Sequence, residues 1–226
     1  MNGVHLALSL VVALGCGWFG ALCADRVPGR LPLRGARVQW GLRSIAIVVA
    51  SSALAVLCAW RLGTSSVAEM LVYVVWFAWM VALSAIDLEH MRLPDALVLP
   101  GFIVGVAVVS VISVVDGNPA RIRYALVGSA ASFAVLLAAH LVSPRGMGFG
   151  DVKFSAVLGL AVGWRADSVA QSLSLVLWSL LLGFGAGSVL GIALLIARRR
   201  NQPFPFGPFL ALGAGITVLV SASILS

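Results

Sequence analysis

Long uncharged apolar runs alternate with short charged segments along the whole chain. We predict helices over eight of these runs, at residues 4–24, 44–61, 68–86, 96–115, 123–143, 151–165, 169–197 and 206–225. A helix needs about 20 apolar residues to cross a hydrocarbon core of about 30 Å, and most of these runs reach or approach that length. The pattern predicts an all-α polytopic membrane protein with about eight transmembrane helices, forming a single membrane-embedded domain over residues 1–226.

Charge is scarce and falls mainly between the apolar runs. Of the 226 residues, 61% are hydrophobic and 10% are charged, whereas soluble domains carry about 25% charged residues. The net charge of +7 would suit a nucleic-acid partner, but the positive residues fall in short loops, where they act as topology signals. We therefore expect the chain to be surrounded by membrane lipid and to have no nucleic-acid partner.

The distribution of Lys and Arg predicts which side of the membrane each loop faces. A signal peptide carries Lys or Arg before its apolar core. In this chain none precedes the first apolar run, and several Arg residues follow it. We therefore expect the N-terminus outside and four cytoplasmic loops, at 25–43, 87–95, 144–150 and 198–205. With Lys153 counted in the third, these loops hold eleven of the 15 Lys and Arg residues, in agreement with the positive-inside rule.

The sixth apolar run is the shortest. Only eleven uncharged residues separate Lys153 from Arg165, so a helix here is either enclosed by other helices or is a re-entrant or interfacial element. Gly159 and Gly163 are spaced as on a close-packing helix face. The alternative is that these glycines are merely tolerated in a membrane helix.

Cysteine and histidine give no sign of a metal site. Cys16, Cys23 and Cys58 lie in apolar runs without a CxxC pair, which supports neither a zinc site nor a disulfide framework. His5 and His140 have no second ligand at a suitable spacing, so for each we expect a local hydrogen bond. We expect neither a metal nor a cofactor.

Two of the eight acidic residues, Asp87 and Asp151, lie directly against long apolar runs. Two predicted crossings separate them, and an even number returns the chain to the same face of the membrane. Two carboxylates that share a site hold one proton between them, as in the aspartic proteases. The alternatives are charges that anchor helix ends at the interface, and the ion site of a transporter, which would lie nearer the midplane.

The remaining acidic residues have simpler interpretations. Asp95 follows Leu93 and Pro94 and is expected to cap the next helix at its N-terminus. Glu89 falls in a short polar turn. The other four lie among turns and arginines and are expected to be solvated loop charges: Asp25, Glu69, Asp116 and Asp167.

Three motifs resemble those of the type IV prepilin peptidases, a family of GxGD-type intramembrane aspartyl proteases. They are SAIDLEHMRLPD (84–95), GMGFGDVK (146–153) and PFPFGPFLALGA (203–214), in the family's order. The resemblance implies that Asp87 and Asp151 are catalytic, and Asp151 at a helix start is expected to be the ionised member of the pair. It implies an active-site loop with Gly146, Gly148 and Gly150, and it matches Asp95 and Lys153 to family positions for which we expect a substrate-positioning role. We expect the same role for Glu89, because it is an acid in a predicted cytoplasmic loop that a basic leader would meet.

The resemblance also implies a reaction and a place in the cell. The substrate would be a prepilin or pseudopilin, cleaved at the cytoplasmic boundary of the inner membrane. A preflagellin-type peptidase is the alternative within the same class. Many family members carry two CxxC pairs in the first cytoplasmic loop and also methylate the new N-terminus, but loop 25–43 contains no cysteine. N-methylation is therefore not expected of this chain.

Overall fold

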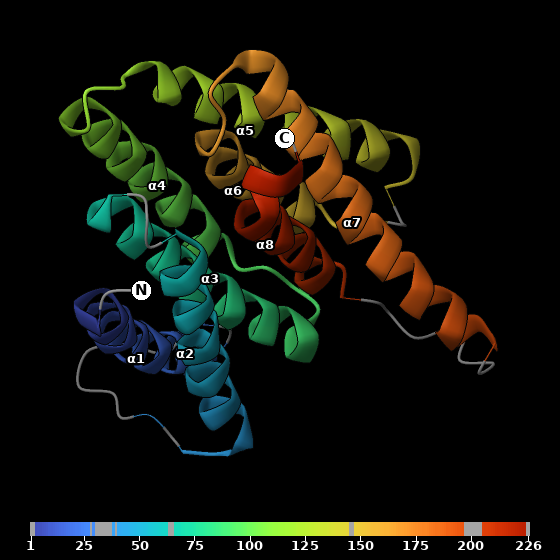
Figure 1. The fold of residues 1–226 in the computed structure, drawn as a ribbon. Coiled ribbons are helices and arrows are strands. Elements are labelled where there is room, and N and C mark those ends of the chain that lie inside the picture. Colours follow the sequence, from blue (N-terminus) through green and yellow to red (C-terminus); the bar gives the residue numbers. More distant parts are fainter. Residues whose placement is uncertain are drawn as a thin grey trace. The chain divides into compact units, whose positions relative to one another are not determined.

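The structure, a computed structural model, describes residues 3–27, 29, 38, 40–62, 66–144, 147–196 and 205–224. Within these ranges the chain forms helices and no strand (Figure 1). The helices are α1 (Gly3–Arg26), α2 (Leu42–Leu62), α3 (Val67–His90), α4 (Asp95–Val115), α5 (Ala120–Val142), α6 (Phe149–Trp164), α7 (Val169–Ile196) and α8 (Gly207–Ile224). Every predicted helix is present, and the all-α class is confirmed.

Six helices of the described chain are long and apolar enough to cross a membrane, namely α1, α2, α3, α4, α5 and α7. The protein is therefore a multi-pass membrane protein, as the apolar runs predict. α6 and α8 are shorter, and the number of eight crossings stays a prediction. So does the external N-terminus.

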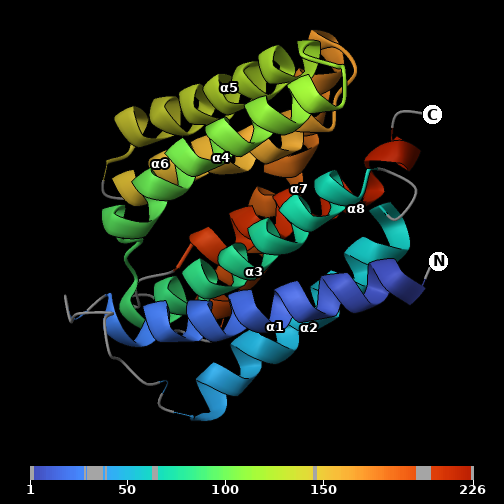
Figure 2. The same cartoon turned by 90° about the vertical axis from the view of Figure 1, so that its left-hand side faces the viewer.

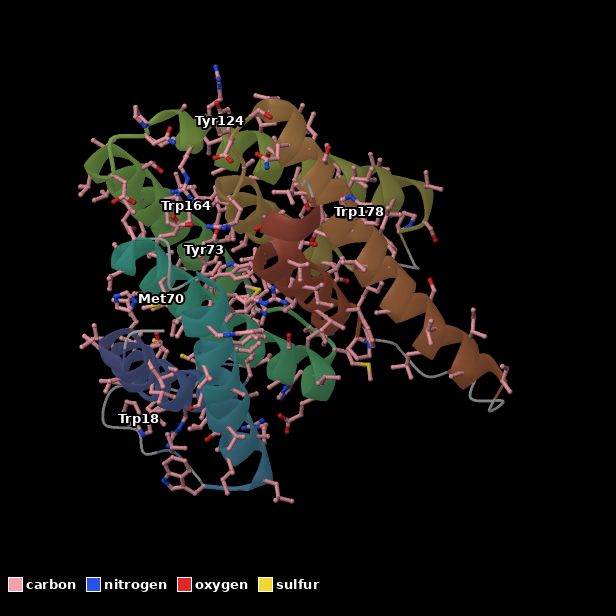
Figure 3. The ribbon with its side chains drawn as sticks, viewed as in Figure 1. Trp18, Met70, Tyr73, Tyr124, Trp164 and Trp178 are labelled. Atoms are coloured by element: carbon pink, nitrogen blue, oxygen red, sulfur yellow. The ribbon has the colours of Figure 1, made fainter. Side chains whose placement is uncertain are left out.

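The helices form two compact units, Met1–His90 and Met91–Ser226. The first unit contains α1, α2 and α3, each of which packs against the other two (Figure 2). Small residues allow this packing: a Cβ atom at Gly20 of α1 would lie 2.9 Å from the Cβ of Ala82 in α3. Met70 and Tyr73 of α3 are fully buried (Figure 3).

One acidic residue of the first unit differs from its prediction. Glu69, expected as a solvated loop charge, lies in the first turn of α3 and is only 4% exposed. α3 begins at Val67, and the backbone N–H of Glu69 donates to the hydroxyl of Ser66 just before the helix. A helix N-terminus favours an acidic side chain, so the dipole of α3 contributes to stabilising a carboxylate at this buried position.

In the second unit, α6 packs against α4, α5, α7 and α8. Eleven of its 16 residues are buried. At 1.5 Å per residue its length is about 24 Å, less than a bilayer core of about 30 Å. The alternative in which neighbouring helices enclose this short helix is therefore confirmed.

The glycines of α6 lie at its contact with α5. A Cβ at Gly163 would stand 2.6 Å from the carbonyl oxygen of Tyr124, and one at Gly159 would overlap the carbonyl of Gly128. Real Cβ atoms do not approach other heavy atoms so closely. Gly159 and Gly163 are therefore a close-packing face rather than merely tolerated glycines.

Trp164 is the last residue of α6 (Figure 3). Its carbonyl oxygen accepts hydrogen bonds from Nε and Nη2 of Arg121, at 3.1 and 2.9 Å, and the Arg121 guanidinium lies over the Trp164 ring. Its indole N–H donates to the hydroxyl of Ser113 in α4 at 2.9 Å. A cation is favourable at a helix C-terminus, where carbonyl groups lack partners, so Arg121 stabilises this buried helix end.

Candidate functional site

Asp87 lies in the last turn of α3 and is buried, with 4% of its surface exposed. We predicted that this helix ends at residue 86, but it continues to His90. The residues that follow Asp87 begin with Leu88 and Glu89, both good helix formers, and they carry the helix past the apolar run. Asp87 is therefore held on a regular helix, not in a loop.

Arg43 joins all three helices of the first unit at the end that carries Asp87. Its guanidinium forms ion pairs with Asp25 in α1 and with Glu89 in α3. Arg43 itself lies at the start of α2, so one cation fixes the end of α1 and the end of α3. Asp25, expected as a solvated charge, is instead a half-buried member of this cluster.

Met91 ends α3 with a left-handed backbone. Its φ is 50°, and it has the only positive φ found at a non-glycine residue of the described chain. For an L-residue this conformation costs about 1–2 kcal/mol, and glycine usually takes the place that follows a helix end. Met91 is therefore a strained stop between α3 and the segment that leads to α4.

We expect Met91→Gly to be neutral or to raise the free energy of unfolding by about 1 kcal/mol, because relief of strain offsets the entropy that glycine adds to the unfolded chain. Met91→Ile should destabilise the protein, because a β-branched residue tolerates positive φ poorly. Thermal melting in detergent measures both changes. If Met91→Ile proved more stable than Met91→Gly, that result would contradict backbone strain at this position.

Asp151 occupies the first turn of α6, which begins at Phe149, two residues earlier than predicted. Its backbone N–H donates to the carbonyl of Gly148 at 3.1 Å. Its Oδ2 lies 3.4 Å from where a Cβ of Gly148 would stand. The carboxylate is therefore folded back over the start of its own helix, where the dipole favours a negative charge.

The glycines before Asp151 differ in what they do. Gly148 has φ −68° and ψ 141°, which any residue can adopt, so backbone freedom does not require glycine there. Gly150 packs against Leu93, with 3.3 Å between the two Cβ positions. Its small size lets the first turn of α6 approach the segment before α4. Gly146, the other glycine of the predicted loop, lies outside the described residues.

Asp95 and Lys153 form an ion pair. Lys153 Nζ of α6 lies 2.7 Å from Asp95 Oδ2, and both side chains are partly exposed. Asp95 is the first residue of α4, whose N-cap is Pro94. The prediction that Asp95 caps this helix is therefore wrong, because its carboxylate reaches across to α6 instead.

The third motif serves the contact between α7 and α8. Residues 203 and 204 lie outside the described chain. The carbonyl of Phe206 accepts hydrogen bonds from the N–H groups of Phe209 and Leu210. These hydrogen bonds form the first turn of α8. The Phe206 ring packs on Phe184, with centroids 5.0 Å apart, and a Cβ at Gly187 would lie 2.9 Å from it. The described part of this motif thus contributes packing, and no titratable group.

The structure brings together some of the predicted site residues within each unit. Asp87 and Glu89 share one end of the first unit, and Asp95, Asp151 and Lys153 share one end of the second. Within the described ranges, no group of three or more His, Cys, Asp or Glu side chains could hold a metal ion. Sequence reasoning missed Arg43, because an Arg in a predicted cytoplasmic loop looks like a topology signal alone.

Comparison with known proteins supplies the context for these acids. The chain is 34% identical to the prepilin leader peptidase/N-methyltransferase of Pseudomonas putida over 200 residues, which is 87% of this chain and 61% of that protein. The protein of the same name from Aeromonas salmonicida is 35% identical over 152 residues, or 64% of this chain and 47% of that protein. The protein of the same name from Pseudomonas aeruginosa is 31% identical over 186 residues, which is 79% of this chain and 59% of that protein.

These relatives are longer than the matched region, and the chain spans about half to three fifths of their length. No solved structure matched the chain significantly. The profile of the type IV leader peptidase family matches residues 74–220, which is more than half of the chain and includes both Asp87 and Asp151. This chain is a member of the type IV leader peptidase family.

Proposed function

We propose that this protein is a prepilin leader peptidase that hydrolyses one peptide bond with the Asp87 and Asp151 carboxylates. The observation that carries the proposal is that the family match over residues 74–220 includes both acids, one in the last turn of α3 and the other in the first turn of α6. Leu93 packs on Gly150, next to Asp151, and so supports the turn that carries this acid. Crossing parity supports the same pairing, since two helices separate the acids.

The reaction follows from two carboxylates with one proton between them. Asp151, at a helix N-terminus, is the ionised member and takes a proton from water, while the protonated Asp87 donates to the scissile carbonyl oxygen. The hydroxide adds to the carbonyl carbon and forms a tetrahedral diol. When the diol collapses, one of its hydroxyl groups gives a proton to the Asp87 carboxylate, the C–N bond breaks, and the leaving nitrogen takes a proton from the Asp151 carboxyl group, which restores the starting pair.

The positive-inside rule supports a site at the cytoplasmic face of the inner membrane. A substrate cut there would present a basic leader to the cytoplasm and an apolar helix to the lipid. Prepilins and pseudopilins, the substrates that the family resemblance implies, have this form. The names of the relatives also include N-methyltransferase. We do not extend that activity to this chain, because loop 25–43 has no cysteine.

Glu89, Asp95 and Lys153 were predicted to position the substrate. Glu89 pairs with Arg43, and Asp95 pairs with Lys153, so their charges have partners without any substrate. We infer that these pairs hold the helix ends that carry the two catalytic acids. Asp95–Lys153 fixes α4 against the start of α6, and Arg43–Glu89 fixes the end of α3 to α2.

Co-expression with a candidate prepilin tests the function itself. Wild-type protein should convert the precursor to a shorter form, and sequencing of the product should show one cleaved bond after the basic leader. A prepilin with a leader of ordinary length and charge that stays uncut by the folded, membrane-inserted protein would argue against the proposal. A second precursor, of preflagellin type, distinguishes the alternative within the class.

We expect Lys153→Asp to lower kcat/KM about tenfold, because it places two carboxylates in contact at the start of α6. The double variant Asp95→Lys/Lys153→Asp should recover most of the activity, because the pair is restored in reverse. Protein stability should change by no more than about 1 kcal/mol, since the pair is partly exposed. Single-variant and double-variant rates on one prepilin peptide give the coupling.

The charge exchange separates two roles for this pair. If Asp95 or Lys153 contacts the leader directly, exchanging them reverses the charges that the leader meets. The double variant would then be no better than Lys153→Asp. That result would favour substrate recognition over the positioning of helix ends.

A further inference from the structure

We propose that His140 is a positioning residue for Asp151, acting through a hydrogen bond to the backbone of the loop that starts α6. This inference rests on the proposed function, because it assigns a role toward the catalytic use of Asp151. His140 lies outside all three family-like motifs, in the last turn of α5. The sequence predicted only that it makes a local hydrogen bond.

The predicted hydrogen bond exists and it reaches the active-site loop. His140 Nδ1 lies 2.8 Å from the carbonyl oxygen of Met147. A carbonyl oxygen can only accept, so Nδ1 is the donor and carries a hydrogen. The imidazole also contacts the Phe149 ring, with centroids 5.5 Å apart and planes tilted by 53°. One side chain of α5 therefore holds the residues on both sides of Gly148.

Gly148 connects this contact to Asp151. The carbonyl that His140 binds belongs to the peptide unit that joins Met147 to Gly148, and Gly148 is the N-cap of α6. The carbonyl of Gly148 in turn accepts the N–H of Asp151, and the Asp151 carboxylate folds back toward Gly148. Fixing the 147–148 peptide therefore fixes the turn on which the carboxylate rests.

Lys153 gives Phe149 a second contact. Lys153 Nζ stands 5.1 Å from the centroid of the Phe149 ring while it pairs with Asp95. The first turn of α6 is thus held by α5 through His140 and by α4 through Asp95. Without His140, the loop that starts α6 would lose its hydrogen bond to α5, and the turn that carries Asp151 would be held less firmly.

The contacts of His140 fit a positioning role: its Nδ1 donates to the Met147 carbonyl and its ring lies against Phe149. A positioning role predicts a lower kcat with little change in KM, because the substrate-binding surface is retained while the acid is misplaced. Small displacements of a catalytic group can cost up to about 100-fold in rate.

Three substitutions at His140 separate the hydrogen bond from the ring. The side-chain nitrogen of Asn can occupy the place of Nδ1, that of Gln the place of Nε2, and Leu offers no donor. We expect His140→Leu and His140→Gln to lower kcat on a prepilin peptide about tenfold or more, with KM within twofold of wild type. His140→Asn should retain at least half of the activity. His5→Leu in α1 is the matched control and should leave kcat unchanged.

Hydrogen exchange over residues 147–153, in protein reconstituted into lipid nanodiscs, gives a readout that does not depend on cleavage. We expect faster exchange in the Leu and Gln variants and wild-type exchange in the Asn variant. Exchange that is unchanged in all three variants would overturn the role of His140, as would equal loss of kcat in all three. If wild type cleaves no prepilin while the exchange pattern appears as expected, the proposed function fails and the support of the loop stands.

Discussion

Replacing either Asp87 or Asp151 with Asn is expected to abolish detectable leader cleavage while leaving the fold intact. Asn keeps the size of the side chain but cannot take or give the proton that the reaction needs. Loss of a general acid or base typically lowers the rate by about 10²- to 10⁴-fold, and the two acids work as one unit, so each single change should approach the full loss. The measurement is the conversion of a co-expressed prepilin, followed by rates with purified protein.

Asp167→Asn is the control for this pair. Asp167 is an exposed acid in the turn between α6 and α7, at the other end of α6 from Asp151, and its replacement should leave cleavage unchanged. Activity above about a tenth of wild type in either Asp87→Asn or Asp151→Asn would contradict the paired mechanism. Infrared titration of the same two variants tests the roles of the two acids. Asp151 in the Asp87→Asn variant should be more acidic than Asp87 in the Asp151→Asn variant.

The hydrophobic pattern predicted the helices well because each of them is a local property of the chain. Seven of the eight predicted starts lie within two residues of the observed ones, and the start of α5 differs by three. The largest difference at a helix end is the four-residue extension of α3 to His90, where hydropathy falls but helix propensity does not. That extension decides whether Asp87 lies in a loop or on a helix.

The candidate acids could be predicted, but their supports could not. Asp87 and Asp151 stand out because charge beside an apolar run is rare in this chain. Arg43 and Leu93 do not stand out, since each acts on residues that only tertiary packing brings near. For His140 the sequence predicted a local hydrogen bond but not its partner. The burial of Glu69 was missed for the same reason: the sequence gives no sign of which helix face becomes covered.

The short α6 shows how the second unit supports its candidate acid. Arg121 and Ser113 hold its last residue, Trp164, through the hydrogen bonds described above. At the opposite end, α4 and α5 hold the turn that carries Asp151. A helix fixed at both ends and enclosed along its length transmits any change in its packing to the carboxylate. A substitution at the glycine contact between α5 and α6 should cause the largest change in the packing of α6.

Gly159→Ala is therefore expected to destabilise the second unit and to lower cleavage as well. The added methyl group would overlap the carbonyl of Gly128 and stand 2.6 Å from the Cβ of Ser132, so α5 and α6 must move apart. Overpacking of a well-packed core typically costs about 1–3 kcal/mol, and contact with backbone rather than a flexible side chain puts this change at the upper end. Thermal melting in detergent should show a fall of about 5–10 °C, given about 2–4 °C per kcal/mol for a protein of this size.

Gly185→Ala in α7 is the matched control, because it makes the same chemical change in another membrane helix. A Cβ there would meet nothing within 4 Å, and alanine is the better helix former by about 1 kcal/mol. This variant should melt at or slightly above the wild-type temperature and cleave normally. Equal melting of the Gly159 and Gly185 variants would mean that α5 and α6 can separate without cost, and that Asp151 does not depend on this contact for its position.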